Sequence, residues 1–154
     1  MGGAQRLAAS ILAVLAVGIA SPAAAHRDDQ WVFRREWGDG SSRTSAVFLS
    51  WDYSVVLFRA TCDHARHELV LDYYGDGELP LSADMGLAVS GSSRAQFRTR
   101  LIDGRLEGRM NVNRATLRAF SGSRDLEIDA PNEMGEPWYV GKAAPLRRLA
   151  RLCL

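Results

Sequence analysis

The segment from Cys62 to Glu68 holds the densest group of side chains that could do chemistry, with one thiol, two imidazoles and two carboxylates in seven residues. Thiolate, imidazole and carboxylate groups are all ligands of zinc. Zinc motifs on a helix place two histidines four residues apart, whereas His64 and His67 are three apart in a polar connection between two expected strands. We therefore favour a solvated loop and keep a metal site on His64 and His67 as the alternative.

Two further patterns suggest metal binding but lack what such sites need. Carboxylates gather around Gly77, as in calcium loops, but the regular order and the closing glutamate of those loops are absent. If a leader is cleaved after Ala25, His26 becomes the amino terminus, and an amine with its own imidazole can chelate copper. That site needs a second histidine, which only His64 or His67 can supply. We assign no metal and no cofactor.

No motif for nucleophilic catalysis is present in the sequence. The G-x-S-x-G pattern of hydrolases does not occur, and spacing alone cannot select an acid and base pair from 18 acidic residues. Cys62 is expected to be oxidised and so is a poor candidate nucleophile. We name no catalytic residue and expect a protein that is not an enzyme.

The first 25 residues have the three-part layout of a secretory signal peptide. Arg6 precedes an apolar stretch from Leu7 to Ala20, and small residues follow up to Ala25, where a signal peptidase would cut. A membrane span needs about 20 apolar residues, and this stretch is shorter. We expect residues 1–25 to be removed and residues 26–154 to form one exported domain, either periplasmic or secreted.

Without this leader the chain carries 18 basic and 18 acidic side chains and is formally neutral. Proteins that bind nucleic acid usually have a strong basic excess, so we exclude nucleic acid as a partner. No later stretch is apolar enough to span a bilayer, so we expect no stable membrane span after processing. The sequence indicates no oligomeric state.

The two cysteines, Cys62 and Cys153, are expected to form a disulfide in an exported protein. Both fall on the apolar side of a predicted element. Cys62 follows Phe58 with the alternation of a strand, and Cys153 follows Leu149 with the spacing of a helix. The bridge would join the end of the chain to its middle.

Apolar and polar residues alternate in several short segments, as in half-buried strands. The pattern predicts strands near 31–37 and over 44–51, 55–62, 67–74, 85–89, 126–130 and 138–140. A short helix is predicted from Asn113 to Ser121, and a second one begins at Ala143 or Pro145. The expected fold is α+β and mostly antiparallel β, a curved sheet or sandwich with two short helices and one disulfide.

The clearest local signal is the pair Asp103-Gly104, which predicts a two-residue type I′ turn within a hairpin over 94–112. Such a turn fixes the register so that paired residue numbers sum to 207. One face of the hairpin is then apolar. The other face sets Arg98 directly opposite Arg109.

Arginines that oppose each other directly repel, so something anionic has to compensate them. The compensation can be intramolecular, from Glu107 opposite Arg100 and from carboxylates of an adjacent strand. It can also come from an anionic ligand or an acidic protein surface. We hypothesise that Arg98, Arg100 and Arg109 form a face that binds an anion or a partner.

Three features give the chain a resemblance to known proteins: the strand LFRATC at 57–62, the helix capped by Asn113, and GKAAPLRRL at 141–149 before Cys153. With the signal peptide, this layout resembles small secreted proteobacterial proteins of the invasion-associated locus B type and type VI secretion accessory proteins of the TagO kind. The resemblance implies a β-rich accessory or binding protein of the cell envelope with no known catalysis, bridged between Cys62 and Cys153.

We therefore expect a small, exported, non-enzymatic protein of the envelope that binds a protein or an anionic ligand through its arginine-rich hairpin face. The alternative is a small periplasmic hydrolase or metal-binding protein that uses the loop from Asp63 to Glu68.

Overall fold

A computed structural model of the protein describes residues 31–38, 41–50, 55–75, 77, 79–121, 125–133, 135–141 and 143–154. The expected signal peptide and His26 lie outside these residues, as does the predicted end of a strand at Trp51.

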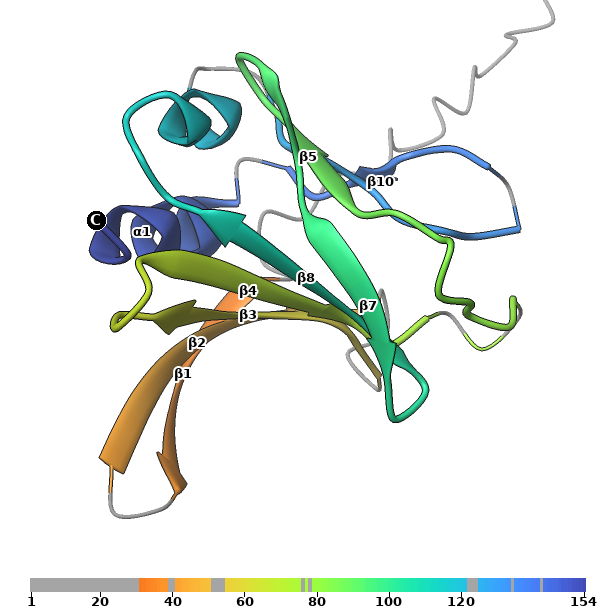
Figure 1. The fold of residues 1–154 in the computed structure, drawn as a ribbon, viewed down its shortest axis with the longest axis horizontal. Helices are drawn as coiled ribbons and strands as arrows, with labels where there is room; N and C mark the ends of the chain where they lie inside the picture. Colours follow the sequence, from red (N-terminus) through yellow and green to blue (C-terminus); the bar gives the residue numbers. More distant parts are fainter. Residues whose placement is uncertain are drawn as a thin grey trace, which may run out of the picture.

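Two antiparallel sheets make up most of the described chain (Figure 1). The first contains, in spatial order, β1 (Trp31–Gly38), β2 (Ser41–Leu49), β3 (Val56–Asp63), β4 (Glu68–Tyr73), β8 (Arg105–Asn111) and β7 (Arg98–Ile102). The second contains β10 (Trp138–Tyr139), β9 (Glu127–Asp129), β5 (Ala88–Ser90) and β6 (Arg94–Gln96). A 3-10 helix, η2 (Thr116–Phe120), and an α-helix, α1 (Ala144–Leu152), complete the mostly antiparallel α+β fold, as predicted.

Aromatic rings form the centre of the core and connect the two sheets. Phe58 of β3 and Tyr73 of β4 stack with their ring centres 4.9 Å apart, and Trp138 of β10 meets Phe58 edge-on at 6.0 Å. Phe58 is fully buried, whereas the next residue, Arg59, points to the opposite side of the sheet. Each buried aromatic side chain stabilises the fold by roughly 1.5–3 kcal/mol, so this cluster holds the sheets together.

Helix α1 covers one end of the first sheet and contacts β1, β2, β3 and η2. Leu149 and Cys153 are buried on its inner side, as their spacing predicted. The guanidinium of Arg148, on its outer side, lies 5.3 Å from the centre of the Phe33 ring. Cys153 is bonded to Cys62 of β3, 91 positions earlier, with Cα atoms 5.5 Å apart. The predicted disulfide is confirmed and ties α1 to the middle of the sheet.

The hairpin predicted over 94–112 is confirmed only between β7 and β8. These strands pair in the register that sums to 207, so Arg98 lies opposite Arg109. Asp103 and Gly104 both have positive φ angles, 48° and 79°, as a type I′ turn requires. Residues 94–96 were predicted to continue the hairpin, but they form β6 and pair with β5 in the second sheet.

The chain changes sheets at Phe97, whose ring is buried and whose N–H donates to the carbonyl of Leu87 at 2.9 Å. A Cβ at Gly108 would lie 2.8 Å from the Cβ of Phe97, so the missing side chain lets the two segments cross closely. A short loop joins β5 to β6, and such local pairing has a low cost of loop closure. This explains why β6 pairs with β5 rather than with β8.

Other predicted boundaries also differ, and the strand predicted over 85–89 is β5, which begins three residues later at Ala88. The strand predicted from residue 44 begins at Ser41, because its pairing with β1 extends to Gly38 opposite Ser41. The helix predicted from Asn113 is the shorter 3-10 helix η2, although the Asn113 side chain does accept hydrogen bonds from the N–H groups of Ala115 and Thr116. Within the described part of the chain, no helix is long and apolar enough to cross a bilayer.

Removal of the disulfide should cost a large share of the protein's stability. Replacing Cys62 and Cys153 with Ala should lower the free energy of unfolding by up to about 4.6 kcal/mol, because the bridge restricts a long segment of the unfolded chain. Urea denaturation measures this loss. Reduced wild-type protein is the matched control, since it lacks the bond but keeps both side chains. A loss below about 1 kcal/mol in both would show that α1 is held mainly by packing.

Candidate functional site

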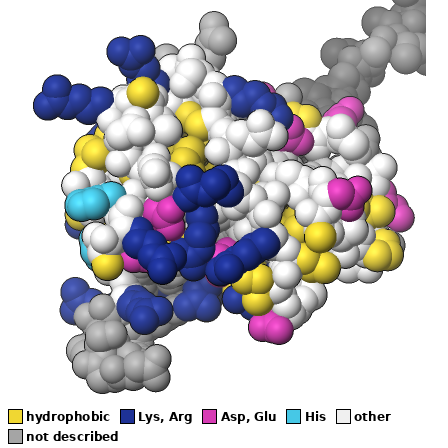
Figure 2. Space-filling view, in the orientation of Figure 1, with side chains coloured by type: hydrophobic (Ala, Val, Ile, Leu, Met, Phe, Trp, Pro, Cys, Tyr) yellow, Lys and Arg dark blue, Asp and Glu magenta, His cyan; other side chains and the backbone are white. Residues whose placement is uncertain are grey.

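The side of the first sheet that faces away from the core is covered with charged side chains, and we call it the ionic face. Strand alternation places them there, because every second residue points away from the core. Figure 2 shows arginines gathered on this side with acidic side chains between them. The members of the ionic face are Arg43, Arg59, Asp63, Glu68, Asp72, Arg98, Arg100, Arg105, Glu107 and Arg109.

The register of the sheet sets like charges side by side on the ionic face. Asp72 of β4 lies opposite Glu107 of β8, and Asp63 of β3 lies opposite Glu68 of β4. The sheet thus contains one pair of directly opposed arginines, as predicted, and two pairs of directly opposed acids. Like charges that face each other directly are destabilising. The register is therefore favourable only because ion pairs form across it.

Arg109 is the centre of these ion pairs. Its Nε donates to Oε1 of Glu107 at 2.7 Å, and its Nη1 lies 3.4 Å from Oδ2 of Asp63 and 3.4 Å from Oε2 of Glu68. One guanidinium thus contacts acids from β3, β4 and β8, while Arg98 adds a second contact to Glu68. The sequence suggested Arg109 as a ligand contact, but the structure places its donors against carboxylates of the protein itself.

The other arginines of the hairpin are paired in the same way. Arg100 donates to Oε1 of Glu107 from Nε at 3.0 Å and from Nη2 at 2.7 Å. Nε of Arg105 donates to Oδ1 of Asp72 at 3.1 Å. The intramolecular compensation that the sequence suggested, from Glu107 and from the adjacent strand β4, is therefore what the structure shows.

Exposure separates the three predicted site residues. The side chains of Arg98 and Arg100 are 66% and 60% exposed, whereas that of Arg109 is 24% exposed. The acids that they bind, Glu68 and Glu107, are 9% and 8% exposed. Arg98 and Arg100 can therefore meet a partner while they hold these acids, and Arg109 acts mainly inside the protein.

Two opposing effects act on the ionisation of Glu107. Burial disfavours its carboxylate, but the hydrogen bonds from Arg109 and Arg100 favour it more strongly, so the pKa of Glu107 lies below its usual value of 4.5. The hydrogen bond to Glu107 likewise raises the pKa of Arg109. Both groups are thus charged at neutral pH.

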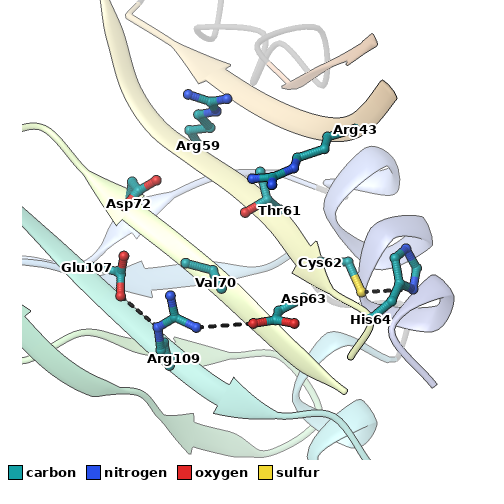
Figure 3. A pocket seen from close by; sticks show the side chains of 10 residues that line it. All are labelled: Arg43, Arg59, Thr61, Cys62, Asp63, His64, Val70, Asp72, Glu107 and Arg109. Carbon is teal, nitrogen blue, oxygen red and sulfur yellow. Dashed lines mark hydrogen bonds and ion pairs between the residues drawn. The ribbon is translucent and has the colours of Figure 1, made fainter. Parts of the chain in front are cut away.

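A cavity of ≈ 570 Å³ opens on the ionic face (Figure 3). Its charged lining consists of Arg43, Arg59, Asp63, Asp72, Glu107 and Arg109. Arg43 comes from β2 and Arg59 from β3, and neither was among the predicted site residues. The polar side of β3, where Arg59 and Thr61 alternate with buried residues, is a sequence signal for Arg59 but not for Arg43.

The two histidines considered as a metal site lie in the turn between β3 and β4, beside the disulfide. Nδ1 of His64 is 3.5 Å from Sγ of Cys62, and Nδ1 of His67 is 3.3 Å from the carbonyl oxygen of Cys153. The carboxylates at the two ends of this turn are bound by arginines, which compete with a metal. Among the residues that the structure describes, no cluster of three or more His, Cys, Asp or Glu could hold a metal ion.

Comparison of the chain with protein-family models, with curated proteins and with solved structures finds no match. Function therefore has to be argued from the ionic face and its cavity.

Replacing Arg109 with Gln should destabilise the protein more than replacing Arg98 with Gln. The first change leaves buried Glu68 and Glu107 with fewer partners and should lower the free energy of unfolding by about 2–3 kcal/mol. The second removes an exposed side chain and should cost less than about 1 kcal/mol. Urea denaturation at neutral pH measures both. Equal losses would contradict the central position of Arg109.

Stability should fall in acid partly through Glu107. Because the pKa of Glu107 is lower in the folded than in the unfolded protein, its contribution is complete above about pH 4.5 and is lost as the pH falls through the folded-state pKa. A Glu107→Gln variant should therefore lose less stability than the wild type between neutral pH and about pH 3. Glu133→Gln, at an exposed position, is the control and should follow the wild type. Parallel curves for all three proteins would refute the assignment.

Proposed function

We propose that the protein is an exported, non-enzymatic binding or accessory protein of the cell envelope that captures an anionic ligand or an acidic protein surface through its ionic face. The signal-peptide pattern of residues 1–25 supports export, and a disulfide suits an oxidising compartment. The sequence resemblance to secreted proteins of the invasion-associated locus B and TagO kinds agrees with this proposal.

A local surplus of arginine carries the proposal. The ionic face carries six arginines and four acids, which leaves a net charge of +2 there. The arginines are Arg43, Arg59, Arg98, Arg100, Arg105 and Arg109, and the acids are Asp63, Glu68, Asp72 and Glu107. Because the chain without its leader is formally neutral, the positive charge is concentrated on one face, where it attracts anions.

The ion pairs support recognition as well as stability. Arg98 and Arg100 are each held at one end of their guanidinium by a buried acid, and most of each side chain remains exposed. A guanidinium has five N–H donors, so one or two bonds to an acid leave donors for a ligand. Because the acids hold the guanidinium groups in place, less side-chain entropy is lost on binding.

Replacing Arg98 and Arg100 together with Gln should weaken binding to a polyanion. The wild-type protein should be retained on immobilised dextran sulfate but not on dextran, and the double variant should elute at lower salt, since salt screens the remaining attraction. Circular dichroism checks that the variant is folded.

The matched control is the pair Arg118→Gln and Arg151→Gln, which removes the same charge from exposed positions on η2 and α1. The control should elute with the wild type. Retention that is lost equally in both double variants would show a response to net charge alone, and retention on plain dextran would contradict anion binding.

A further inference from the structure

A second hollow opens where the chain passes from the second sheet to the first, between β6 and β7. On the β6 side of the pair Arg98 and Arg109, the chain turns away from β8 and pairs with β5 instead. In Figure 1, β8 and the chain that leads from β6 to β7 diverge with distance from the turn at 103–104. A cavity of ≈ 430 Å³ lies between them, and we call it the β6–β8 hollow. Its lining includes Arg94, Gln96, Arg98, Met110 and Asn111, with the start of η2 at the wide end.

Backbone groups of both strands point into the β6–β8 hollow. Hydrogen bonds alternate in direction along an antiparallel strand. The N–H of Phe97 donates to the chain just before β5 at 2.9 Å, so the N–H and C=O groups of Arg94 and Gln96 point away from β5. The N–H of Val112 donates to the turn between β3 and β4 at 2.8 Å, so that of Asn111 points toward β6. These three N–H groups have no hydrogen-bond partner in the described part of the chain.

This mixture of donors and acceptors matches an extended peptide. The edge of β6 offers both N–H and C=O groups, at Arg94 and at Gln96, and β8 offers the N–H of Asn111. A phosphate or sulfate ion only accepts hydrogen bonds and would leave the carbonyl groups without donors. A peptide backbone carries one donor and one acceptor per residue, and free strand edges bind peptides through these groups.

The narrow end of the hollow suits a carboxylate. Arg98 and Arg94 form ion pairs with Glu68 and Asp129, so their charges are compensated, but neither acid lines the hollow. Each guanidinium uses only its Nη2 for this contact, is more than half exposed, and keeps other N–H donors for a ligand. No described lining residue is acidic. A carboxylate in the hollow would therefore meet donors and no lining acid.

We infer that the β6–β8 hollow binds the carboxyl-terminal residues of a partner protein, with the terminal carboxylate at Arg98. The inference rests on the proposed function and names its ligand class. A chain end fits better than an internal segment, because β7 and β8 pair directly at the narrow end and leave no room for a strand to continue. The buried side chain of Met110 and the half-buried Ala95 line the hollow as well, so they favour an apolar last residue.

Selection from a library of random heptapeptides displayed with free carboxyl ends tests the inference. The selected peptides should share an apolar last residue. Fluorescence anisotropy should then show that the best peptide binds at least ten-fold more tightly as the free acid than as the amide, because the amide lacks the charge that strengthens its hydrogen bonds to arginine. Equal affinity of acid and amide, or a library that yields no binder, would overturn the site.

Replacing Arg98 with Gln should weaken binding of the free acid roughly ten-fold, the usual effect of losing a hydrogen bond to a charged group. Arg114→Gln is the matched control, because Arg114 is an exposed arginine between lining residues of the hollow that does not itself line it. The control should bind within about two-fold of the wild type. Circular dichroism checks that both variants are folded. An equal loss in both would indicate diffuse attraction and would contradict a defined carboxylate site.

A second library, displayed with free amino ends and blocked carboxyl ends, separates chain ends from internal segments. Binders of equal affinity from this library would refute the preference for a carboxyl terminus. Retention on dextran sulfate separates this inference from the proposed function. If the wild type is retained there but selects no peptide with a free carboxyl end, only the inference fails, and if it neither is retained nor selects a peptide, both fail.

Discussion

The guanidinium of Arg109 holds together acids from three strands, and the register of the first sheet depends on it. The cross-strand pairing sets two pairs of acids directly opposite each other, and the acids nearest the centre are almost fully buried. Buried carboxylates need both charge partners and hydrogen bonds, and one planar group with several donors supplies both. A shift of one residue would turn the apolar side of every strand outward, so the core and the ion pairs require the same register.

Strand β3 connects this network to the disulfide. Cys62 is bonded to Cys153 at the end of α1, and it lines the cavity together with its neighbours Thr61 and Asp63. The covalent bond at Cys62 thus restrains the position of the polar groups beside it. Helix α1 adds no side chain to the cavity, yet it restrains the wall on which Arg59 and Thr61 lie.

Much of the fold was predictable because it depends on residues that are close together in the sequence. The alternation of apolar and polar residues indicated the strands, and the turn at 103–104 fixed the pairing of β7 with β8. The partner of β6 was not predictable, since it depends on how closely Phe97 passes over Gly108, a tertiary contact. The same holds for the site. Arg98 was found because it pairs within a hairpin, whereas Arg43 and Arg59 reach the cavity only through the order of strands in the sheet, which a single sequence does not display.

The cavity is lined by residues of β2, β3, β4 and β8, and the pairing of β2 with β3 is irregular. Their register shifts between Phe48 and Leu49, and such an irregularity bends and twists a strand. Figure 1 shows β1 and β2 turning away from the plane of β4 and β8, so the ionic face is concave rather than flat. Because the sheet bends, Arg43 of β2 and Arg109 of β8 line the same cavity although two other strands lie between them.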